Sequence, residues 1–232
     1  MRIWVTRAAP DAEATAQRLR ELGHTPLIGP VLEVRHLAKP APSLAGVGAL
    51  AFTSRNGVSA FAAVSPRRDL PVFAVGAATA DAARALGFGK VFSANGDVAA
   101  LAKLIARRRD LFSGAVLYAG AREPAGDLPA ALQAEGIAVR RHVVYAVEVM
   151  EPPLAATAAL SAEPIELDAI LVYSPRAGRR LAEIQALARV AQSLDAFCIS
   201  DAAAEPLRTL NFRRLAVAAK PNEDALLALL AN

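Results

Sequence analysis

Short apolar runs alternate along the chain with Ala- and Leu-rich stretches typical of helices. This alternation predicts parallel β-sheets covered by helices. Most of these short runs are apolar along their length, as expected for a strand that is buried on both faces. The predicted strands are Ile3–Val5, Leu50–Thr53, Val72–Val75, Lys90–Phe92, Ala115–Tyr118, Ile170–Tyr173, Ala196–Ile199 and Leu215–Ala218.

The chain also contains an internal repeat whose parts occur in permuted order. The matching segments are 73–88 with 197–212, 51–58 with 171–178, and 116–124 with 3–10. The segment that ends the first repeat therefore opens the chain for the second. A repeat in this order predicts that one domain is discontinuous and that the other is inserted into it.

The repeat predicts two similar doubly wound α/β domains with parallel sheets. The discontinuous domain comprises residues 1–33 and 150–232, and the inserted domain comprises residues 38–143. The chain crosses between them at residues 31–37 and 143–149, which have the composition and partial alternation of β-strands. Because the two crossings run in opposite directions, we expect them to pair as a two-stranded antiparallel β-ladder, with freedom for domain motion.

Composition excludes several classes of protein. With 232 residues, of which 54% are hydrophobic, the chain is not disordered. The mean hydropathy of +0.32 comes mostly from alanine, and no apolar stretch approaches the ~20 residues of a membrane-spanning helix. The first residues do not resemble a signal peptide, so we expect a cytoplasmic protein. One cysteine, Cys198, and three scattered histidines offer no metal-binding spacing and no disulfide.

Arginine greatly outnumbers lysine among the basic residues. Only four of the 26 are lysines, and the formal net charge is +4. The arginine excess has two interpretations: coding bias, or recognition of carboxylates or phosphates by the planar guanidinium. Arg107–Arg109 fits a solvated helix end, and aromatic residues make up only 5% of the chain, so we do not expect nucleic-acid binding.

Polar residues follow the predicted strands, where parallel sheets bind ligands. Ser, Thr and Asn before a helix are N-cap residues in the first place, and they become anion contacts only where backbone N–H groups and side chains converge. Both roles remain open for each residue. The candidate ligand contacts are Arg7, Ser54, Arg55, Gly76, Thr79, Asn95, Ser174 and Arg176.

The sequence lacks the common motifs for nucleotide binding and for nucleophilic catalysis. There is no G-x-G-x-x-G after the first strand, no phosphate-binding G-x-x-x-x-G-K-[ST] and no nucleophile elbow. The strand ends are also poor in carboxylates and histidine, which argues against a paired acid and base. Tyr145 lies on the second crossing, where its hydroxyl either reaches a ligand or is satisfied by packing. Tyr118 and Tyr173 end buried strands and fit the core.

These features resemble the uroporphyrinogen-III synthase family over nearly the whole chain. The segments that carry the resemblance are Val5-Thr6-Arg7, Phe52-Thr53-Ser54, Asn56-Gly57-Val58, Ala74-Val75-Gly76, Leu117-Tyr118-Ala119, Val144-Tyr145 and Tyr173-Ser174-Pro175. The resemblance implies a site in the cleft between two α/β domains. It also implies that Tyr145 assists departure of the substrate hydroxyl and that Ser54, Thr79 and Ser174 lie near substrate carboxylates.

Two positions depart from the family pattern. Ala8 replaces the usual proline of the opening motif, and Ile199-Ser200-Asp201 lacks the glycine and threonine of the corresponding turn. Asp201 would repel a polycarboxylate, so we carry over no contact there.

The resemblance implies a cofactor-independent, metal-free lyase that cyclises and dehydrates the linear tetrapyrrole hydroxymethylbilane. The last ring is inverted through a spiro intermediate, giving uroporphyrinogen III for heme synthesis. We expect a monomer that meets hydroxymethylbilane synthase transiently. The alternative is a non-enzymatic, two-lobed binding protein for a small polyanion.

Overall fold

The computed structural model describes residues 1–9, 11–37 and 40–231, and these fall into two compact units. Unit 1 comprises Met1–Glu33 and Glu148–Asn232, and unit 2 comprises Val34–Val147. Residues 38 and 39, where the sequence predicts the inserted domain to begin, lie outside the described part, as does the end of the 3–10 repeat segment. Among the described residues, no helix has the length and apolar character needed to cross a membrane.

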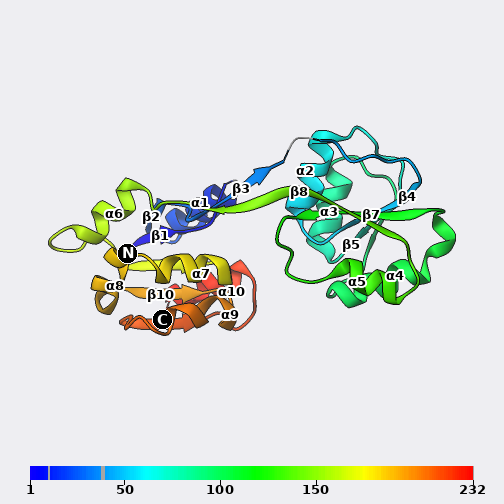
Figure 1. Cartoon of the computed structure of the whole chain (residues 1–232). Coiled ribbons are helices and arrows are strands. Elements are labelled where there is room, and N and C mark those ends of the chain that lie inside the picture. Colours follow the sequence, from blue (N-terminus) through cyan, green and yellow to red (C-terminus); the bar gives the residue numbers. More distant parts are fainter. Residues whose placement is uncertain (10, 38–39, 232) are drawn as a thin grey trace. The chain divides into compact units, whose positions relative to one another are not determined.

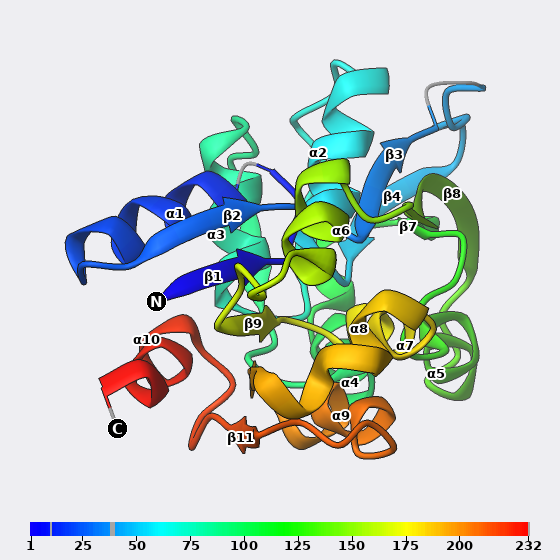
Figure 2. The same ribbon diagram turned by 90° about the vertical axis from the view of Figure 1, so that its left-hand side faces the viewer.

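Unit 1 is built on a five-stranded parallel sheet with the order β11-β10-β9-β1-β2. Both chain termini lie in this unit (Figures 1 and 2). Its strands are β1 Arg2–Val5, β2 Thr25–Ile28, β9 Ala169–Val172, β10 Asp195–Cys198 and β11 Arg214–Val217. Its α-helices are α1 Asp11–Glu21, α6 Leu154–Ser161, α7 Pro175–Ala182, α8 Gln185–Val190, α9 Asp201–Ala204 and α10 Glu223–Leu227. Short 3₁₀ helices span Ala191–Ser193, Glu205–Leu207 and Ala228–Ala231.

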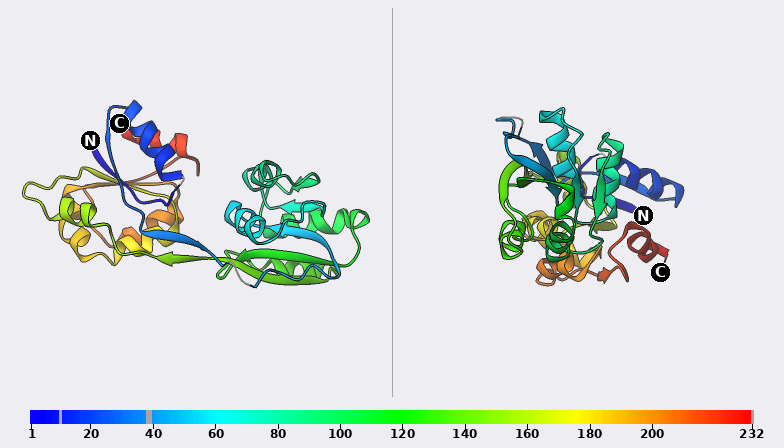
Figure 3. Two further views of the ribbon diagram at one scale, coloured as in Figure 1. Left: turned by 90° about the horizontal axis from the view of Figure 1, so that it is seen from above. Right: turned by 90° about the vertical axis from the view of Figure 1, so that its right-hand side faces the viewer.

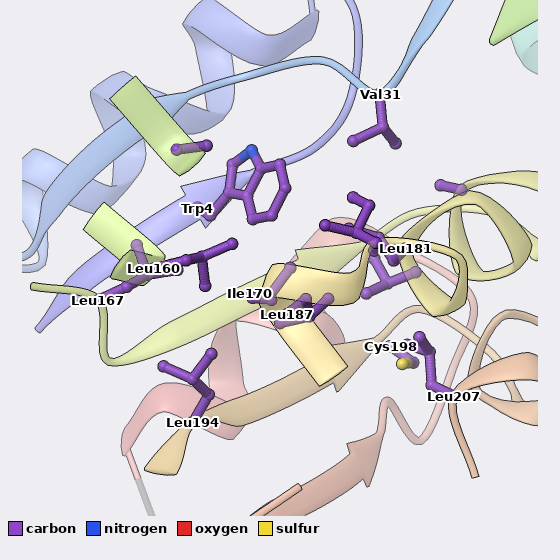
Figure 4. Packing of buried hydrophobic residues seen from close by; sticks show 14 of the residues in the cluster. Trp4, Val31, Leu160, Leu167, Ile170, Leu181, Leu187, Leu194, Cys198 and Leu207 are labelled. Carbon is purple, nitrogen blue, oxygen red and sulfur yellow. The ribbon is translucent and has the colours of Figure 1, made fainter. Parts of the chain in front are cut away.

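Alternate residues of the unit 1 strands face opposite layers of helices, because side chains on a strand alternate between the two faces. On one face, Trp4 and Ile170 pack with residues of α6 to α9, including Leu181 and Leu187 (Figure 4). On the other face, Ile3 and Leu171 pack with α1 and α10. Figure 3 shows α1 and α10, in blue and red, on one side of the sheet and the yellow and orange helices on the other.

Unit 2 contains a six-stranded sheet with the order β3-β8-β7-β4-β5-β6. Its strands are β3 Leu32–His36, β4 Val47–Phe52, β5 Val72–Ala74, β6 Val91–Ser93, β7 Ala115–Ala121 and β8 Val139–Val149. Its helices are α2 Arg55–Val64, α3 Ala77–Ala85, α4 Val98–Arg107, the 3₁₀ turn Arg109–Leu111 and α5 Leu128–Ala134. One face of the sheet packs with α2 and α3, and the other packs with α4 and α5. Both sheets are thus doubly wound.

The strand orders follow the permuted repeat. Positions β11, β10, β9, β1 and β2 of the first sheet correspond to β6, β5, β4, β7 and β8 of the second. The repeat segments therefore occupy equivalent places. Segment 197–212 begins in β10, next to the edge strand β11, and segment 73–88 begins in β5, next to the edge strand β6. The α/β class with parallel sheets is confirmed.

Strands β3 and β8 lie next to each other in the sheet, and each contains a unit boundary. The Leu37 N–H donates to the Val144 carbonyl at 2.8 Å, and the Met150 N–H donates to the Val31 carbonyl at 3.0 Å. Residue 31 pairs with residue 150 and residue 37 pairs with residue 144, so β3 and β8 run antiparallel. Strand β8 also begins four residues before the expected crossing and pairs in parallel with β7 from Val139 to Tyr145. It therefore completes the sheet of unit 2 as well as pairing with β3.

Candidate functional site

The carboxyl end of β4 brings two consecutive hydroxyl groups, Thr53 and Ser54, to one edge of the unit 2 sheet. Ser54 is the N-cap of α2: its backbone is extended, and its Oγ accepts a hydrogen bond from the Gly57 N–H at 3.0 Å. Gly57 permits a close approach, because a Cβ atom there would lie 2.9 Å from the Ala119 carbonyl oxygen. The first turn of α2 consequently lies tightly against β7.

Tyr145 reaches the same edge from β8. Its hydroxyl lies 2.8 Å from Ser54 Oγ, and its carbonyl accepts a hydrogen bond from the Arg122 N–H at 2.9 Å. The side chain is 6% exposed and packs in the cluster that contains Phe52 and Val144. Burial raises the pKa of Tyr145 above its ordinary value, and the Ser54 hydrogen bond offsets part of this effect. The phenol is therefore neutral near pH 7 and able to donate a hydrogen bond.

A second hydroxyl pair lies beside the first. Thr53 Oγ1 and the Tyr118 hydroxyl are 3.1 Å apart, and Tyr118 is fully buried. The Tyr118 ring passes over Gly120, where a Cβ atom would lie 2.6 Å from the ring. The pairing of Thr53 with Tyr118 was not predicted from the sequence. The available signal was strand alternation: adjacent residues 53 and 54 face opposite sides of the sheet, so they meet tyrosines from opposite core layers.

The other candidates in unit 2 follow neighbouring strands of the same sheet. Gly76 is the N-cap of α3 and makes no side-chain cap, while Thr79 is buried in the first turn of that helix. Asn95, after β6, adopts a φ of +50° and accepts a hydrogen bond from the Ser93 hydroxyl at 2.7 Å. Arg55 is the exposed first residue of α2. Among these candidates, Ser54 and Tyr145 are joined directly through their hydroxyl groups.

In unit 1, Arg7 belongs to an internal network of charges. Its guanidinium contacts the Asp11 carboxylate at 2.6 Å and the Glu223 carboxylate at 3.4 Å, and it lies 4.4 Å from the centre of the Tyr173 ring. The Tyr173 hydroxyl lies 3.4 Å from Glu223 Oε1, and burial raises the pKa of Tyr173 to about 12. Two carboxylates thus already balance the charge of Arg7, and its predicted contact with a ligand stays a prediction.

The remaining candidates of unit 1 lie at the start of α7. Ser174 Oγ caps this helix by accepting a hydrogen bond from the Ala177 N–H at 3.1 Å, and Arg176 is half-buried in the first turn. The turn after β10 departs from the family pattern without losing its cap, because Ser200 accepts from the Ala203 N–H. Asp201 forms an exposed ion pair with Arg208 at 3.3 Å.

Arg141 is a further cation of unit 2, and no sequence motif pointed to it. Its Nη2 donates to the carbonyls of Ala121 and Arg122 at 2.9 and 2.7 Å, beside the end of β7. Across residues 1–9, 11–37 and 40–231, no cluster of three or more His, Cys, Asp or Glu side chains is arranged to hold a metal ion.

Two solved structures have a similar fold. Uroporphyrinogen-III synthetase from Helicobacter pylori is 18% identical, with 99% of this chain and 97% of that chain covered and a TM-score of 0.67. A mutant uroporphyrinogen III synthase from Thermus thermophilus is 20% identical, with 100% and 96% covered and a TM-score of 0.57. No curated protein matches significantly in sequence.

A family model described as uroporphyrinogen-III synthase HemD matches residues 13–228. The match spans both units and includes Ser54, Tyr145 and Ser174. With the fold shared by the two solved structures, this nearly complete match shows that the chain belongs to the uroporphyrinogen-III synthase HemD family.

Proposed function

We propose that this protein is a uroporphyrinogen-III synthase that converts hydroxymethylbilane to uroporphyrinogen III and water. The observation that carries the proposal is the family match over residues 13–228. The neutral, buried phenol of Tyr145 at the carboxyl edge of a parallel sheet supports it, because this edge is where such sheets bind ligands.

The reaction asks the protein for one weak acid and for control of the substrate conformation. The pyrrole nitrogen lone pairs of the substrate expel the hydroxymethyl oxygen, which leaves as water once it has received a proton. Tyr145 donates that proton. The resulting cation is attacked at the substituted carbon of the last ring, and the spiro intermediate fragments and closes again with that ring inverted. Since the unrearranged closure competes, catalysis depends largely on orientation.

Helix N-termini at the strand ends hold the substrate carboxylates in this proposal. Ser54, Gly76 and Ser174 are the N-cap residues of α2, α3 and α7, and each helix offers backbone N–H groups and the positive end of its dipole. Arg55, Thr79 and Arg176 lie in the first turns of these helices, and Asn95 lies in the loop between β6 and α4. Binding of a polyanion by such groups should weaken as salt is added.

We further propose the domain boundaries, assembly and location of the enzyme. Residues 1–33 with 150–232 and residues 38–143 act as two domains joined by the paired segments 31–37 and 143–149. The enzyme works as a cytoplasmic monomer without a metal or cofactor, and it meets hydroxymethylbilane synthase transiently to receive hydroxymethylbilane.

The distinguishing experiment is separation of the product isomers after freshly made hydroxymethylbilane is added to the purified protein. We expect the type III isomer. Formation of the type I isomer alone, as in buffer, would overturn the proposal, and retention of unreacted hydroxymethylbilane on the protein would favour the polyanion-binding alternative.

A further inference from the structure

Ser54 has two hydrogen-bonded neighbours, and their geometry limits what its hydroxyl does. Its oxygen accepts from the Gly57 N–H at 3.0 Å and lies 2.8 Å from the Tyr145 hydroxyl oxygen. A hydroxyl group has one proton and two lone pairs. Because Gly57 occupies one lone pair, either Ser54 donates to Tyr145, or Tyr145 donates to the second lone pair and its proton points away from any ligand.

The first orientation suits a phenol that gives up its proton. Tyr145 is buried beside Phe52 and Val144, where a phenolate would have little stabilisation from water. A donor already aimed at the phenol oxygen stabilises the developing negative charge without any rearrangement during the reaction. Ser54 is such a donor, and its own oxygen is held by the N-terminal turn of the ten-residue helix α2.

We propose that Ser54 is a positioning residue for Tyr145: it donates its hydroxyl proton to the phenol oxygen and leaves the Tyr145 proton available to the substrate. This rests on the proposed function. In the dehydration step the Tyr145 O–H bond and the substrate C–O bond break, and the leaving hydroxyl departs as water. Ser54 stabilises the phenolate, which recovers a proton when the ring carbon that closes the macrocycle loses one.

This role differs from the contact that the sequence predicts for Ser54. As a direct ligand of a substrate carboxylate, Ser54 would act independently of Tyr145. As a positioning residue it acts only through the phenol, so its removal changes nothing once the Tyr145 hydroxyl is absent. A double-mutant cycle separates the two roles.

Ser54 also caps α2, so an alanine substitution at this position has two effects. Other variants separate loss of the cap from loss of the hydrogen bond to Tyr145. Ser54→Ala loses the cap and the bond to Tyr145, whereas Ser54→Gly also loses the hydroxyl but keeps most of the stability of a capped helix. Ser54→Thr retains a hydroxyl that can do both. Asp127→Ala is the matched control for cap loss, because Asp127 caps α5 in the same unit by accepting from the Ala130 N–H at 3.0 Å.

The first test needs no substrate. With three tyrosines in the chain, ¹³Cζ-tyrosine NMR gives few resonances, and Tyr145→Phe assigns the one from Tyr145. In Ser54→Ala and Ser54→Gly we expect Tyr145 to titrate about 1 pH unit higher, because a hydrogen bond that favours the phenolate is gone. Ser54→Thr and Asp127→Ala should leave the titration in place. If Tyr145 titrates at the same pH in the wild type, Ser54→Ala and Ser54→Gly, the proposal is overturned.

The second test is kinetic. Ser54→Ala and Ser54→Gly should each lower kcat about 10-fold with KM within about 2-fold, and Ser54→Thr should restore kcat. In the Tyr145→Phe background the same substitutions should change kcat less than about 2-fold. Additive losses, or a rise in KM alone, would show that Ser54 binds substrate directly. Failure of the proposed function is distinguishable, since the wild-type protein would then yield only the type I isomer while the NMR titration still reports on the contact.

Discussion

Individual side chains in this protein owe their chemical state to burial and to one or two close partners. Tyr145 stays neutral because it is buried, and Ser54 keeps its hydroxyl satisfied. Replacing Tyr145 with phenylalanine removes the phenol hydroxyl, which is the proton donor. The packing is preserved because the phenylalanine ring fills the same space.

We therefore expect Tyr145→Phe to slow turnover at least 10-fold while the free energy of unfolding changes by about 1 kcal/mol, the contribution of one hydrogen bond. Steady-state kinetics and urea denaturation measure the two effects. Tyr118→Phe is the matched control, since it also removes a buried tyrosine hydroxyl from a bond to the β4 end. Equal turnover in Tyr145→Phe and the wild type would make Tyr145 a packing residue.

Cys198 should make stability depend on alkaline pH. Burial raises the pKa of its thiol from 9.0 to about 12. The folded protein then keeps a proton that the unfolded chain releases, so this stabilising effect is full below pH 9 and is lost as the pH rises toward 12. Urea denaturation between pH 8 and 11 should show a smaller loss of stability in Cys198→Ala than in the wild type. Parallel curves for the two proteins would contradict the assignment.

Residue-level prediction from the sequence succeeded where the partner is local. Ser54 and Ser174 were expected as N-caps, and each accepts a hydrogen bond from an N–H three residues later. The environment of Arg7 was not predicted, because its partner Glu223 lies 216 positions away and no local pattern links the two. Whether any of these residues contacts substrate remains a prediction.

At the scale of elements, all eight predicted strands are confirmed, with ends within three residues of the expected ones. Strand β2 was missed because Pro26 interrupts its apolar run. The structure accommodates this proline at the sheet edge, where a strand can spare an N–H group. The early start of β8 was also missed, since the pairing partner of Val139 is Val116 on β7, which only the fold supplies.

Arg68 joins the ends of two helices and should be a stabilising residue of unit 2. Its guanidinium donates to the carbonyls of Ala62 and Ser65 at the end of α2 and of Leu86 at the end of α3, and it stacks on Phe88 at 4.7 Å. Cations stabilise helix C-termini, and the stacking adds a cation–π contribution.

We expect Arg68→Ala to lower the free energy of unfolding by about 1–2 kcal/mol, measured by urea denaturation. The neighbouring Arg67→Ala removes the same side chain from an exposed pair with Asp69 and should change stability much less. Similar losses in the two variants would indicate a general effect of charge rather than capping.

At the scale of the whole molecule, chain order and spatial order differ in the two units. Unit 2 is one continuous segment whose ends approach each other, since Leu37 bonds to Val144. In unit 1, the N-terminal strand β1 lies between β2 and β9, so the C-terminal segment lacks a central strand without it. The permuted repeat predicts which segments occupy equivalent strand positions, whereas the residues that pair across β3 and β8 depend on register.

Residues 34–147 expressed alone should therefore fold cooperatively, whereas residues 148–232 should not. Circular dichroism and two-dimensional NMR of the two fragments provide the measurement. Adding a peptide of residues 1–33 to the second fragment should restore order, because it supplies β1 and β2. A well-folded 148–232 fragment would show that β1 is dispensable to the sheet.

Trp4, the one tryptophan of the chain, is fully buried on β1, and its indole N–H donates to the Gly29 carbonyl at 2.7 Å. Its intrinsic fluorescence is therefore a spectroscopic probe specific to unit 1. Unit 2 contributes no indole emission, although it contributes helix and strand signals in the far ultraviolet. If the units unfold separately, the emission and ellipticity curves will have different midpoints, without any label having been introduced.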